Sequence, residues 1–217
     1  MKYKLEYKYR VKKDEVYFTS DWMDQSTAIT IGEDMERGKK GLDLSFYDEN
    51  GTEWNLKELI KLYAEVEEEP HDFIVYFDGG YRKETNTAGL GVILYFSQGK
   101  KKYRVRANEL FHDMETNNEA EYAAFYHALN LLEELEVKGV TCEFKGDSQV
   151  VLNQLSGEWP CYEESLNKWL DRIEQKLTEM KINAKYTPIG RNENKEADKL
   201  ATQALEEKRI YSKMQII

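Results

Sequence analysis

Polar and apolar residues alternate through the first positions of the chain, and this alternation predicts a strand with one buried face. The apolar members of the pattern are Tyr3, Leu5, Tyr7, Tyr9 and Val11. Residues 28–31 and 42–47 are two further apolar runs, and residues 55–66 have the spacing of an amphipathic helix. The pattern predicts a small, β-rich α+β domain over residues 1–66 that is closed by one helix.

A different pattern begins near residue 72, where strands and helices alternate. The predicted strands cover residues 72–80, 88–96, 102–110, 140–144 and 183–189. The predicted helices cover residues 116–135, 148–156, 161–180 and 194–207. This order predicts an α/β fold over residues 72–207, with a five-stranded mixed sheet flanked by helices.

An acidic run that ends in proline separates the two patterns, and it predicts a linker at residues 67–71. Residues 208–217 follow the last predicted helix and are interpreted as a C-terminal tail. The first ten residues contain no continuous apolar region, so neither a signal peptide nor a membrane span is predicted. We therefore expect a cytoplasmic protein.

The composition, with 41% hydrophobic and 12% aromatic residues, is typical of a folded globular protein. Its net charge of −10 gives no overall attraction to phosphate groups, so a nucleic-acid function needs local basic patches or bound cations. The best basic candidate is the group Lys100, Lys101, Lys102, Arg104 and Arg106. Because alternate residues of a strand share one face, its last three members should line up together. A charged sheet edge that discourages aggregation explains them equally well.

Four acids in the second segment stand out by position, and each also has an ordinary explanation. Asp78 follows an apolar strand and precedes two glycines, where a turn would also place an acid. Glu121 lies in the second turn of a helix that starts with a capping box at residues 116–119. Asp147 follows a strand and could cap the next helix. Asp198 lies one turn into the last helix, where exposed acids are common.

Taken together, the four acids predict a metal site. Acids at the ends of neighbouring strands project toward the same rim of a sheet, and a helix across that rim can add a carboxylate. Converging carboxylates repel one another unless a cation holds them, and oxygen ligands without His or Cys suit Mg²⁺ or Mn²⁺. Two such ions about 4 Å apart are a standard means of cutting a phosphodiester.

Residues 73–205 resemble the ribonuclease H type 1 domain, in the reverse-transcriptase-like variety of bacterial genomes. The resemblance rests on five stretches in family order and with family-like spacing: VYFDGG (75–80), AGLGVIL (88–94), TNNEAEYAA (116–124), GDSQVV (146–151) and NENKEADKLA (192–201). It implies an endoribonuclease that hydrolyses the RNA strand of RNA–DNA hybrids with two Mg²⁺ or Mn²⁺ ions, leaving 5′-phosphate and 3′-hydroxyl ends. It also implies that Asp78, Glu121, Asp147 and Asp198 are the catalytic metal ligands.

The resemblance further implies contacts to the hybrid substrate. The implied contact residues are Gly79, Asn86, Thr116, Asn117, Asn118, Gln149 and Arg191. The side chains of Asn117, Asn118 and Gln149 are expected to read 2′-hydroxyl groups in the minor groove. Gly79 is expected to approach the ribose. Thr116 and Asn86 match contacts to DNA phosphates, Asn86 less closely because its loop differs in length. A purely structural role of Asn117 and Asn118 in the first turn of a helix stays open.

The sequence departs from the family at two places. The flexible histidine that many members carry before the last helix is missing, and Arg191 occupies that region, so proton transfer or product release would use Arg191 or a water. His71, His112 and His127 lie in segments that do not suit this role. The basic protrusion of some members is also missing; Trp159 stands there, a residue type that is more often a packing anchor than a nucleotide platform.

Two other functions stay open at the level of the residues. One is a non-catalytic binding module that keeps the fold, which the net acidity, the missing histidine and the unfamiliar N-terminal domain favour. The other is a nuclease that acts on double-stranded RNA or a chimeric junction. The N-terminal domain carries 11 Lys and Arg against 17 Asp and Glu over residues 1–70. It could bind a protein partner, pair two chains or shield the nuclease.

Overall fold

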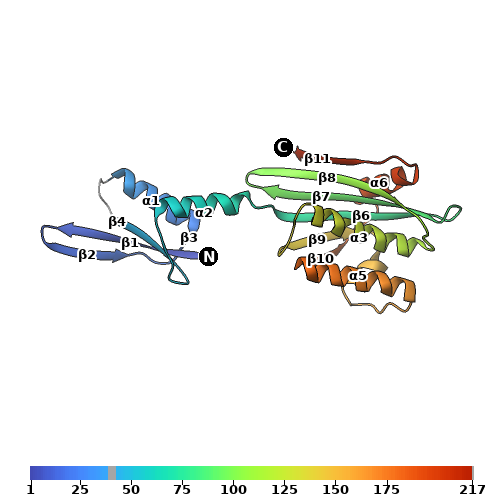
Figure 1. The fold of residues 1–217 in the computed structure, drawn as a ribbon, viewed down its shortest axis with the longest axis horizontal. Coiled ribbons are helices and arrows are strands. Elements are labelled where there is room, and N and C mark those ends of the chain that lie inside the picture. Colours follow the sequence, from blue (N-terminus) through green and yellow to red (C-terminus); the bar gives the residue numbers. More distant parts are fainter. Residues whose placement is uncertain (39–42, 217) are drawn as a thin grey trace. The chain divides into compact units, whose positions relative to one another are not determined.

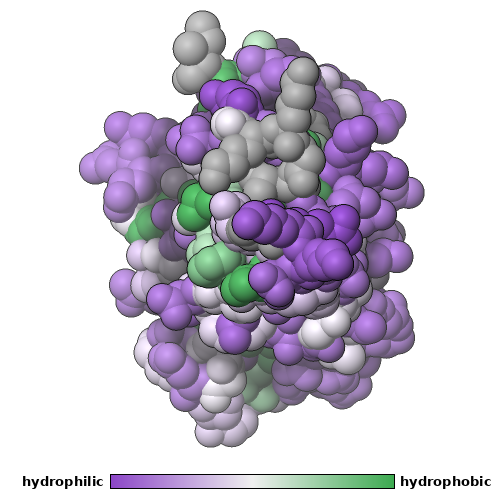
Figure 2. All heavy atoms as spheres, turned by 90° about the vertical axis from the view of Figure 1, so that its left-hand side faces the viewer, coloured by the Kyte–Doolittle hydropathy of each residue, from purple (hydrophilic) through white to green (hydrophobic). Residues whose placement is uncertain are grey.

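The structure is a computed structural model that describes residues 1–38 and 43–216. The chain divides into two compact units, Met1–Glu69 and Pro70–Ile217. Helix α2 runs to Glu68 and strand β6 starts at His71, so the predicted linker at residues 67–71 consists mostly of the ends of regular elements. None of the described helices is long and apolar enough to cross a membrane. The face shown in Figure 2 is mostly hydrophilic, with hydrophobic groups in small, separate spots.

The first unit is an antiparallel sheet covered by two helices. Its strand order is β2 (Asp14–Thr19), β1 (Lys2–Val11), β4 (Asp43–Asp48) and β5 (Glu53–Trp54), and the short β3 (Met23–Asp24) also pairs with β1. The helices are α1 (Gln25–Gly38) and α2 (Leu56–Glu68). Tyr3, Leu5 and Phe46 from the sheet form its core with Ala28 of α1 and with Leu56 and Leu59 of α2. Leu42, in the strand predicted at 42–47, lies outside the described residues.

Residues 28–31, one of the apolar runs of the predicted β-rich pattern, belong to helix α1. The Asp24 carboxylate accepts a hydrogen bond from the Thr27 backbone N–H at 2.9 Å and thereby starts the helix. Ala28 and Gly32 are buried while Thr30 between them is exposed, which is the pattern of a helix face rather than of a strand. The first unit is thus closed by two helices and not by one.

The second unit confirms the expected mixed α/β architecture (Figure 1). Its strands are β6 (His71–Arg82), β7 (Thr87–Gln98), β8 (Lys101–Phe111), β9 (Thr141–Gly146), β10 (Asn183–Pro188) and β11 (Tyr211–Ile216). They lie in the order β10-β9-β6-β7-β8-β11. The pairs β6–β9 and β9–β10 are parallel, and the pairs β6–β7, β7–β8 and β8–β11 are antiparallel.

The sheet has six strands rather than the predicted five, and residues 208–217 are therefore not a tail. Strand β11 pairs with β8 at the edge of the sheet, where Figure 1 shows it in red. Asn108 holds the chain there: its side-chain oxygen accepts from the Ile210 N–H at 2.6 Å, and its amino group donates to the Lys208 carbonyl at 2.9 Å. Strand β11 is mostly exposed and its apolar residues do not alternate regularly, so the sequence has too little pattern to predict this pairing.

Helices cover both faces of the second sheet. On one face lie α3 (Asn117–Glu134), α4 (Gln149–Leu155) and α5 (Glu164–Met180), packed over a core that includes Val92 and Leu94 of β7. The alternate residue Ile93 points to the other face and packs against Ala197 and Leu200 of α6 (Lys195–Leu205). Helix α6 lies directly on the backbone of β7, because a Cβ on Gly91 would come within 2.2 Å of the Ala197 carbonyl oxygen.

Candidate active site

Two of the predicted acids lie side by side, just beyond the point where the parallel pairing of β6 and β9 ends. In the parallel pair β6–β9, Tyr76 lies opposite Lys145. Asp78 and Asp147 each stand two residues further along, so both project from the same rim. Asp147 directly follows β9, and the residue at the N-cap position of α4 is Ser148 rather than Asp147. The ordinary explanation of Asp147 as a helix cap therefore does not apply.

The third acid, Glu121, comes from helix α3, which passes very close to β6. The helix begins at the Thr116 cap, whose hydroxyl oxygen accepts from the Glu119 N–H at 3.1 Å. A Cβ on Gly79 would lie 2.3 Å from the Ala120 backbone, so only glycine allows this approach. The Gly79 N–H in turn donates a hydrogen bond to the Glu121 carboxylate. Gly79 thus brings helix and strand together beside the acids.

Carboxylate oxygens of Asp78, Glu121 and Asp147 all lie within 4.8 Å of one another. Asp78 is 8% exposed and Glu121 is 6% exposed. Oxygen Oε2 of Glu121 is buried and has no hydrogen-bond partner among the described residues. Burying unpaired carboxylates close together is costly without a compensating charge. This cluster therefore has the donor set and the electrostatic need of a site for a hard divalent cation.

The pKa values of the cluster also reflect the cost of burying these carboxylates close together. Burial, together with the nearby charges of Asp147 and Asp198, raises the pKa of Asp78 to about 7. Burial and the charges of Asp78 and Asp147 raise the pKa of Glu121 well above its usual value. The positive charge of Arg191 opposes both shifts. In the absence of a cation, Asp78 would be partly protonated near neutral pH.

Asp198 and Arg191 lie at the edge of the cluster. Asp198 is exposed in the first turn of α6 and is not one of the three acids that meet within 4.8 Å, although its charge acts on Asp78. The Arg191 Nε lies 3.5 Å from Asp147 Oδ2, while its side chain is 95% exposed. Both residues can approach a ligand at this rim from the solvent side.

The remaining predicted contact residues lie on the loops and helix starts around the rim. Asn117 and Asn118 occupy the first turn of α3, one turn before Glu121, and Gln149 is the first residue of α4, two residues after Asp147. Asn86 is on the β6–β7 turn with φ 50°, and its side-chain oxygen accepts from the Tyr81 hydroxyl at 3.0 Å. Nothing in the geometry joins Asn86 to the acids directly.

One residue of the cluster was missed in the sequence analysis. Asn194 is 2% exposed, and its amino group lies 3.2 Å from Asp147 Oδ1 and 3.4 Å from Asp78 Oδ1. The available signal was its place inside the matched stretch 192–201, one helical turn before Asp198. Burial and orientation of the side chain, which give Asn194 its importance, are not visible in the sequence.

The basic strip on β8 is partly paired with one acid of α6. Arg104 Nη1 lies 3.3 Å and Arg106 Nε 3.0 Å from the same carboxylate oxygen of Glu196 on α6. Lys102 is exposed. The two arginines share one face, as the alternation predicts, but that face is engaged with α6 rather than with solvent. They are poor candidates for phosphate contacts.

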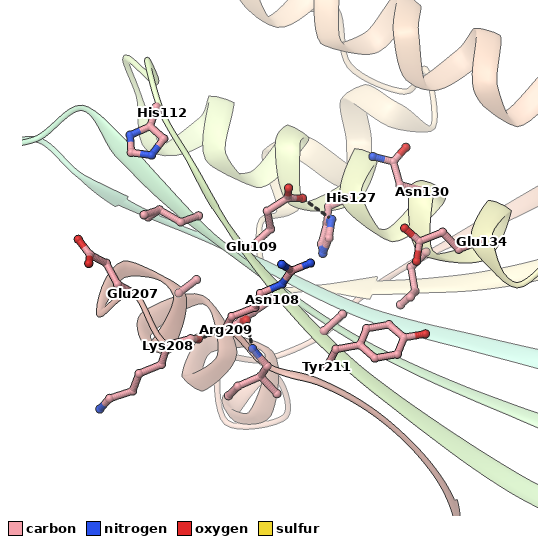
Figure 3. Close-up of a pocket in the computed structure, with 15 residues that line it drawn as sticks. Asn108, Glu109, His112, His127, Asn130, Glu134, Glu207, Lys208, Arg209 and Tyr211 are labelled. Atoms are coloured by element: carbon pink, nitrogen blue, oxygen red, sulfur yellow. Dashed lines mark hydrogen bonds and ion pairs between the residues drawn. The ribbon is translucent and has the colours of Figure 1, made fainter.

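A second concavity, about 720 Å³ in volume, lies away from the acids (Figure 3). His112 and His127 line it, and the His127 Nδ1 lies 2.9 Å from a carboxylate oxygen of Glu109. Arg209 is close enough to Glu109 to help lower the pKa of that acid, after the larger effect of His127. None of the predicted site residues lines this concavity. These two histidines are thus placed outside the candidate active site.

Comparison with known proteins was made for both sequence and structure. The family model described as reverse transcriptase-like matches residues 76–204. The uncharacterized protein YpeP of Bacillus subtilis strain 168 is 45% identical over 196 residues, which cover 90% of this chain and 86% of that protein. Ribonuclease HI of Halobacterium salinarum is 32% identical over 132 residues, which cover 61% of this chain and 63% of that relative.

Solved structures of similar proteins cover the second unit. RNase H1 from Halobacterium salinarum has 31% identity and a TM-score of 0.54, over 62% of this chain and 98% of that chain. LC11-RNase H1, which was solved in complex with an RNA/DNA hybrid, has 25% identity and a TM-score of 0.52, over 63% of this chain and 98% of that chain. Fold and acidic rim together define a ribonuclease H-like α/β domain. The chain belongs to the reverse transcriptase-like family of ribonuclease H-like proteins.

Proposed function

We propose that this protein is a nuclease that hydrolyses the RNA strand of RNA–DNA hybrids with two divalent metal ions, Mg²⁺ or Mn²⁺. The observation that carries the proposal is the meeting of three largely buried carboxylates within 4.8 Å at the end of β6 and β9. Support also comes from the relatives, since a ribonuclease HI and an RNase H1 with a bound RNA/DNA hybrid are among them.

Each acid has a distinct part in the proposal. Asp78 and Asp147 would hold metal directly from the two strand ends. Glu121 would hold one metal from the helix side, facing the 2′-hydroxyl of the substrate, and the exposed Asp198 would complete the second metal site from α6. Bound at these positions, divalent cations activate water and stabilise the leaving oxygen of a phosphodiester.

Other residues of this chain would position the hybrid. Asn117, Asn118 and Gln149 stand on both sides of the acids at helix starts, where amides can pair with 2′-hydroxyls as both donor and acceptor. The space that a side chain of Gly79 would fill is occupied by the Ala120 backbone, so the missing side chain serves the packing of α3 rather than the approach of a ribose. Arg191, which is almost fully exposed beside Asp147, would contact a phosphate and take the place of the missing histidine in product release.

A gel assay with labelled duplexes tests the proposal. Wild type should cleave the RNA strand of an RNA–DNA hybrid in Mg²⁺ or Mn²⁺ and leave RNA–RNA and DNA–DNA duplexes intact. Asp147→Asn should abolish cleavage and keep the circular dichroism spectrum of the wild type. Asp171→Asn, which changes an exposed acid on α5, is the matched control and should cleave normally.

The outcomes separate the alternatives. Equal cleavage by wild type and Asp147→Asn would refute the assignment of the site. Cleavage of RNA–RNA duplexes instead would keep the enzyme and change its substrate. A folded wild type that binds hybrids but cleaves none of the duplexes in either metal would favour the non-catalytic binding module.

A further inference from the structure

Asn194 is the one uncharged side chain that touches both strand-end acids among the described residues. Its amino group lies 2.9 Å from the Phe77 carbonyl oxygen, 3.2 Å from Asp147 Oδ1 and 3.4 Å from Asp78 Oδ1. The side chain comes from the start of α6, whereas the three acceptors belong to β6 and to the end of β9. Asn194 thus ties three separate elements together at the acidic rim.

The orientation of this amide is fixed by its surroundings. All three neighbours are oxygen acceptors, so the amino group has to face them and the amide oxygen has to point away. That oxygen is buried and has no partner among the described residues. A flipped amide would place this oxygen against two carboxylates and a carbonyl, where every contact is repulsive. The side chain is therefore built to donate to the acids.

The Asn194 side chain does not cap its own helix. Asn194 stands at the N-cap position of α6, and its backbone carbonyl accepts from the Asp198 N–H at 3.1 Å. Asparagine is among the best N-cap residues because its side-chain oxygen accepts from the first free N–H groups of a helix. Here no such side-chain hydrogen bond forms, because the amide is turned toward the acids. Helix α6 therefore lacks the stabilisation of a side-chain cap, and the amide contacts the acidic cluster instead.

We infer that Asn194 is a positioning residue for the metal site: its amide holds the carboxylates of Asp78 and Asp147 in one orientation before a divalent cation arrives. This inference rests on the proposed function and adds a residue to it. Asp78 and Asp147 share no other side-chain donor among the described residues, so without the amide their carboxylates would turn away from each other, and a cation would have to bring them back. Polar partners of metal ligands typically account for 10–100-fold in metal affinity.

A calorimetric titration with Mn²⁺, without nucleic acid, tests the inference. Two variants remove the amide: Asn194→Ala leaves a cavity, while Asn194→Leu nearly keeps the volume. Both should bind Mn²⁺ about 10-fold more weakly than wild type. Asn192→Ala is the matched control, because Asn192 is an exposed residue of the same loop without contact to the acids, and its affinity should stay within about 2-fold.

Cleavage of an RNA–DNA hybrid provides a second readout. In the Asn194 variants, the Mn²⁺ concentration for half-maximal cleavage should rise by the same factor as the dissociation constant, while the rate at saturating Mn²⁺ returns to near the wild-type rate. A merely structural residue would lower the thermal midpoint and the saturated rate without this recovery. Recovery by metal would therefore support positioning even in a variant of reduced stability.

Two results would overturn the inference, and they can be told apart. If wild type binds Mn²⁺ and both folded Asn194 variants bind it equally well, Asn194 has no positioning role, and the proposed function stands. If wild type itself binds no Mn²⁺, the metal site of the proposed function fails, and this inference fails with it.

Discussion

Two buried aspartates, one in each unit, show what distinguishes a structural acid from a functional one. Asp48 is 3% exposed and Asp78 is 8% exposed, so burial alone does not separate them. Asp48 accepts hydrogen bonds from the Asn50 and Thr52 N–H groups, both at 2.9 Å, and from the Trp54 ring at 3.2 Å. Asp78 instead has two other acids as its neighbours.

The two carboxyl groups respond to burial in opposite directions. Burial pushes the pKa of Asp48 upward, but the hydrogen bonds from Thr52, Trp54 and Asn50 outweigh it and leave the pKa lowered. Burial and the neighbouring Asp147 and Asp198 raise the pKa of Asp78 to about 7. Asp48 is satisfied by its own turn, whereas Asp78 still needs a positive partner. The comparison indicates that a buried acid crowded by other acids, rather than a buried acid as such, marks the site.

The largest expected difference between the two aspartates is in catalysis. Asp78→Asn should lower the cleavage rate on an RNA–DNA hybrid by about 100-fold or more, because loss of a ligand costs at least as much as loss of a polar partner of a ligand. Asp48→Asn should leave the rate unchanged. Initial rates at saturating Mg²⁺ measure both. Equal losses of cleavage rate in the two variants would contradict the assignment of Asp78 as functional and Asp48 as structural.

The pH dependence of metal-free stability is the next largest effect. The pKa of Asp78 is raised in the folded state, so its contribution to stability is fully present below the unfolded pKa of 3.8 and is lost as the pH rises toward about 7. Glu121 acts in the same direction. A difference of one between the folded and unfolded pKa corresponds to about 1.4 kcal/mol in the free energy of unfolding.

Urea denaturation in EDTA from pH 4 to pH 8 measures this effect. The free energy of unfolding of wild type should fall over the range more steeply than that of Asp78→Asn, and Asp78→Asn should be the more stable protein at pH 8. Identical slopes for the two proteins would mean that the pKa of Asp78 is not raised in the folded state.

Asp48→Asn should have a smaller effect, and on stability alone. Both backbone N–H groups donate to Oδ1, which an asparagine retains. The asparagine amino group would replace Oδ2, so the Trp54 ring N–H, which donates to Oδ2 at 3.2 Å, would be left unsatisfied. Loss of such a bond costs about 1–3 kcal/mol. Thermal unfolding followed by circular dichroism should show a lower midpoint for the transition of the first unit. An unchanged midpoint would indicate that the turn at residues 48–52 forms without Asp48.

Arg191→Ala should have the smallest effect. The side chain is 95% exposed and lies 3.5 Å from Asp147, so solvent screens most of its charge. The maximal cleavage rate should fall by less than about 10-fold, and single-turnover rates should change less than multiple-turnover rates if Arg191 assists product release. A loss of 100-fold or more would instead place Arg191 in the chemical step.

The sequence was sufficient to predict the parts of the site that follow from strand ends and motif order. Asp78 and Asp147 lie next to each other because both stand just beyond the parallel pairing of two neighbouring strands. Glu121 joins them because Gly79 allows α3 to come close to β6. The alternation of strands and helices likewise predicted the mixed sheet. These features depend on the local hydrophobic pattern and on short sequence motifs, and the amino-acid sequence shows the pattern and the motifs directly.

Features set by contacts between distant residues could not be predicted in the same way. Strand β11 is a short, mostly exposed edge strand that depends on Asn108, about 100 residues earlier in the chain. Helix α1 has few strongly apolar residues, so the apolar run at residues 28–31 did not indicate a helix, and the burial of Ala28 and Gly32 on one helix face becomes visible only in the fold. Asn194 acquires its role only when α6 is laid on β7, with Gly91 against Ala197.

The central claim is that the acidic rim cuts RNA in a hybrid only when it holds divalent cations. The most direct test is the initial rate of cleavage of a labelled RNA–DNA hybrid as Mg²⁺ is added back to EDTA-treated protein. The account predicts no cleavage without Mg²⁺, a saturable rise with added Mg²⁺, and products from the RNA strand alone. Cleavage that persists in EDTA, or no cleavage at any concentration of Mg²⁺ or Mn²⁺, would contradict it.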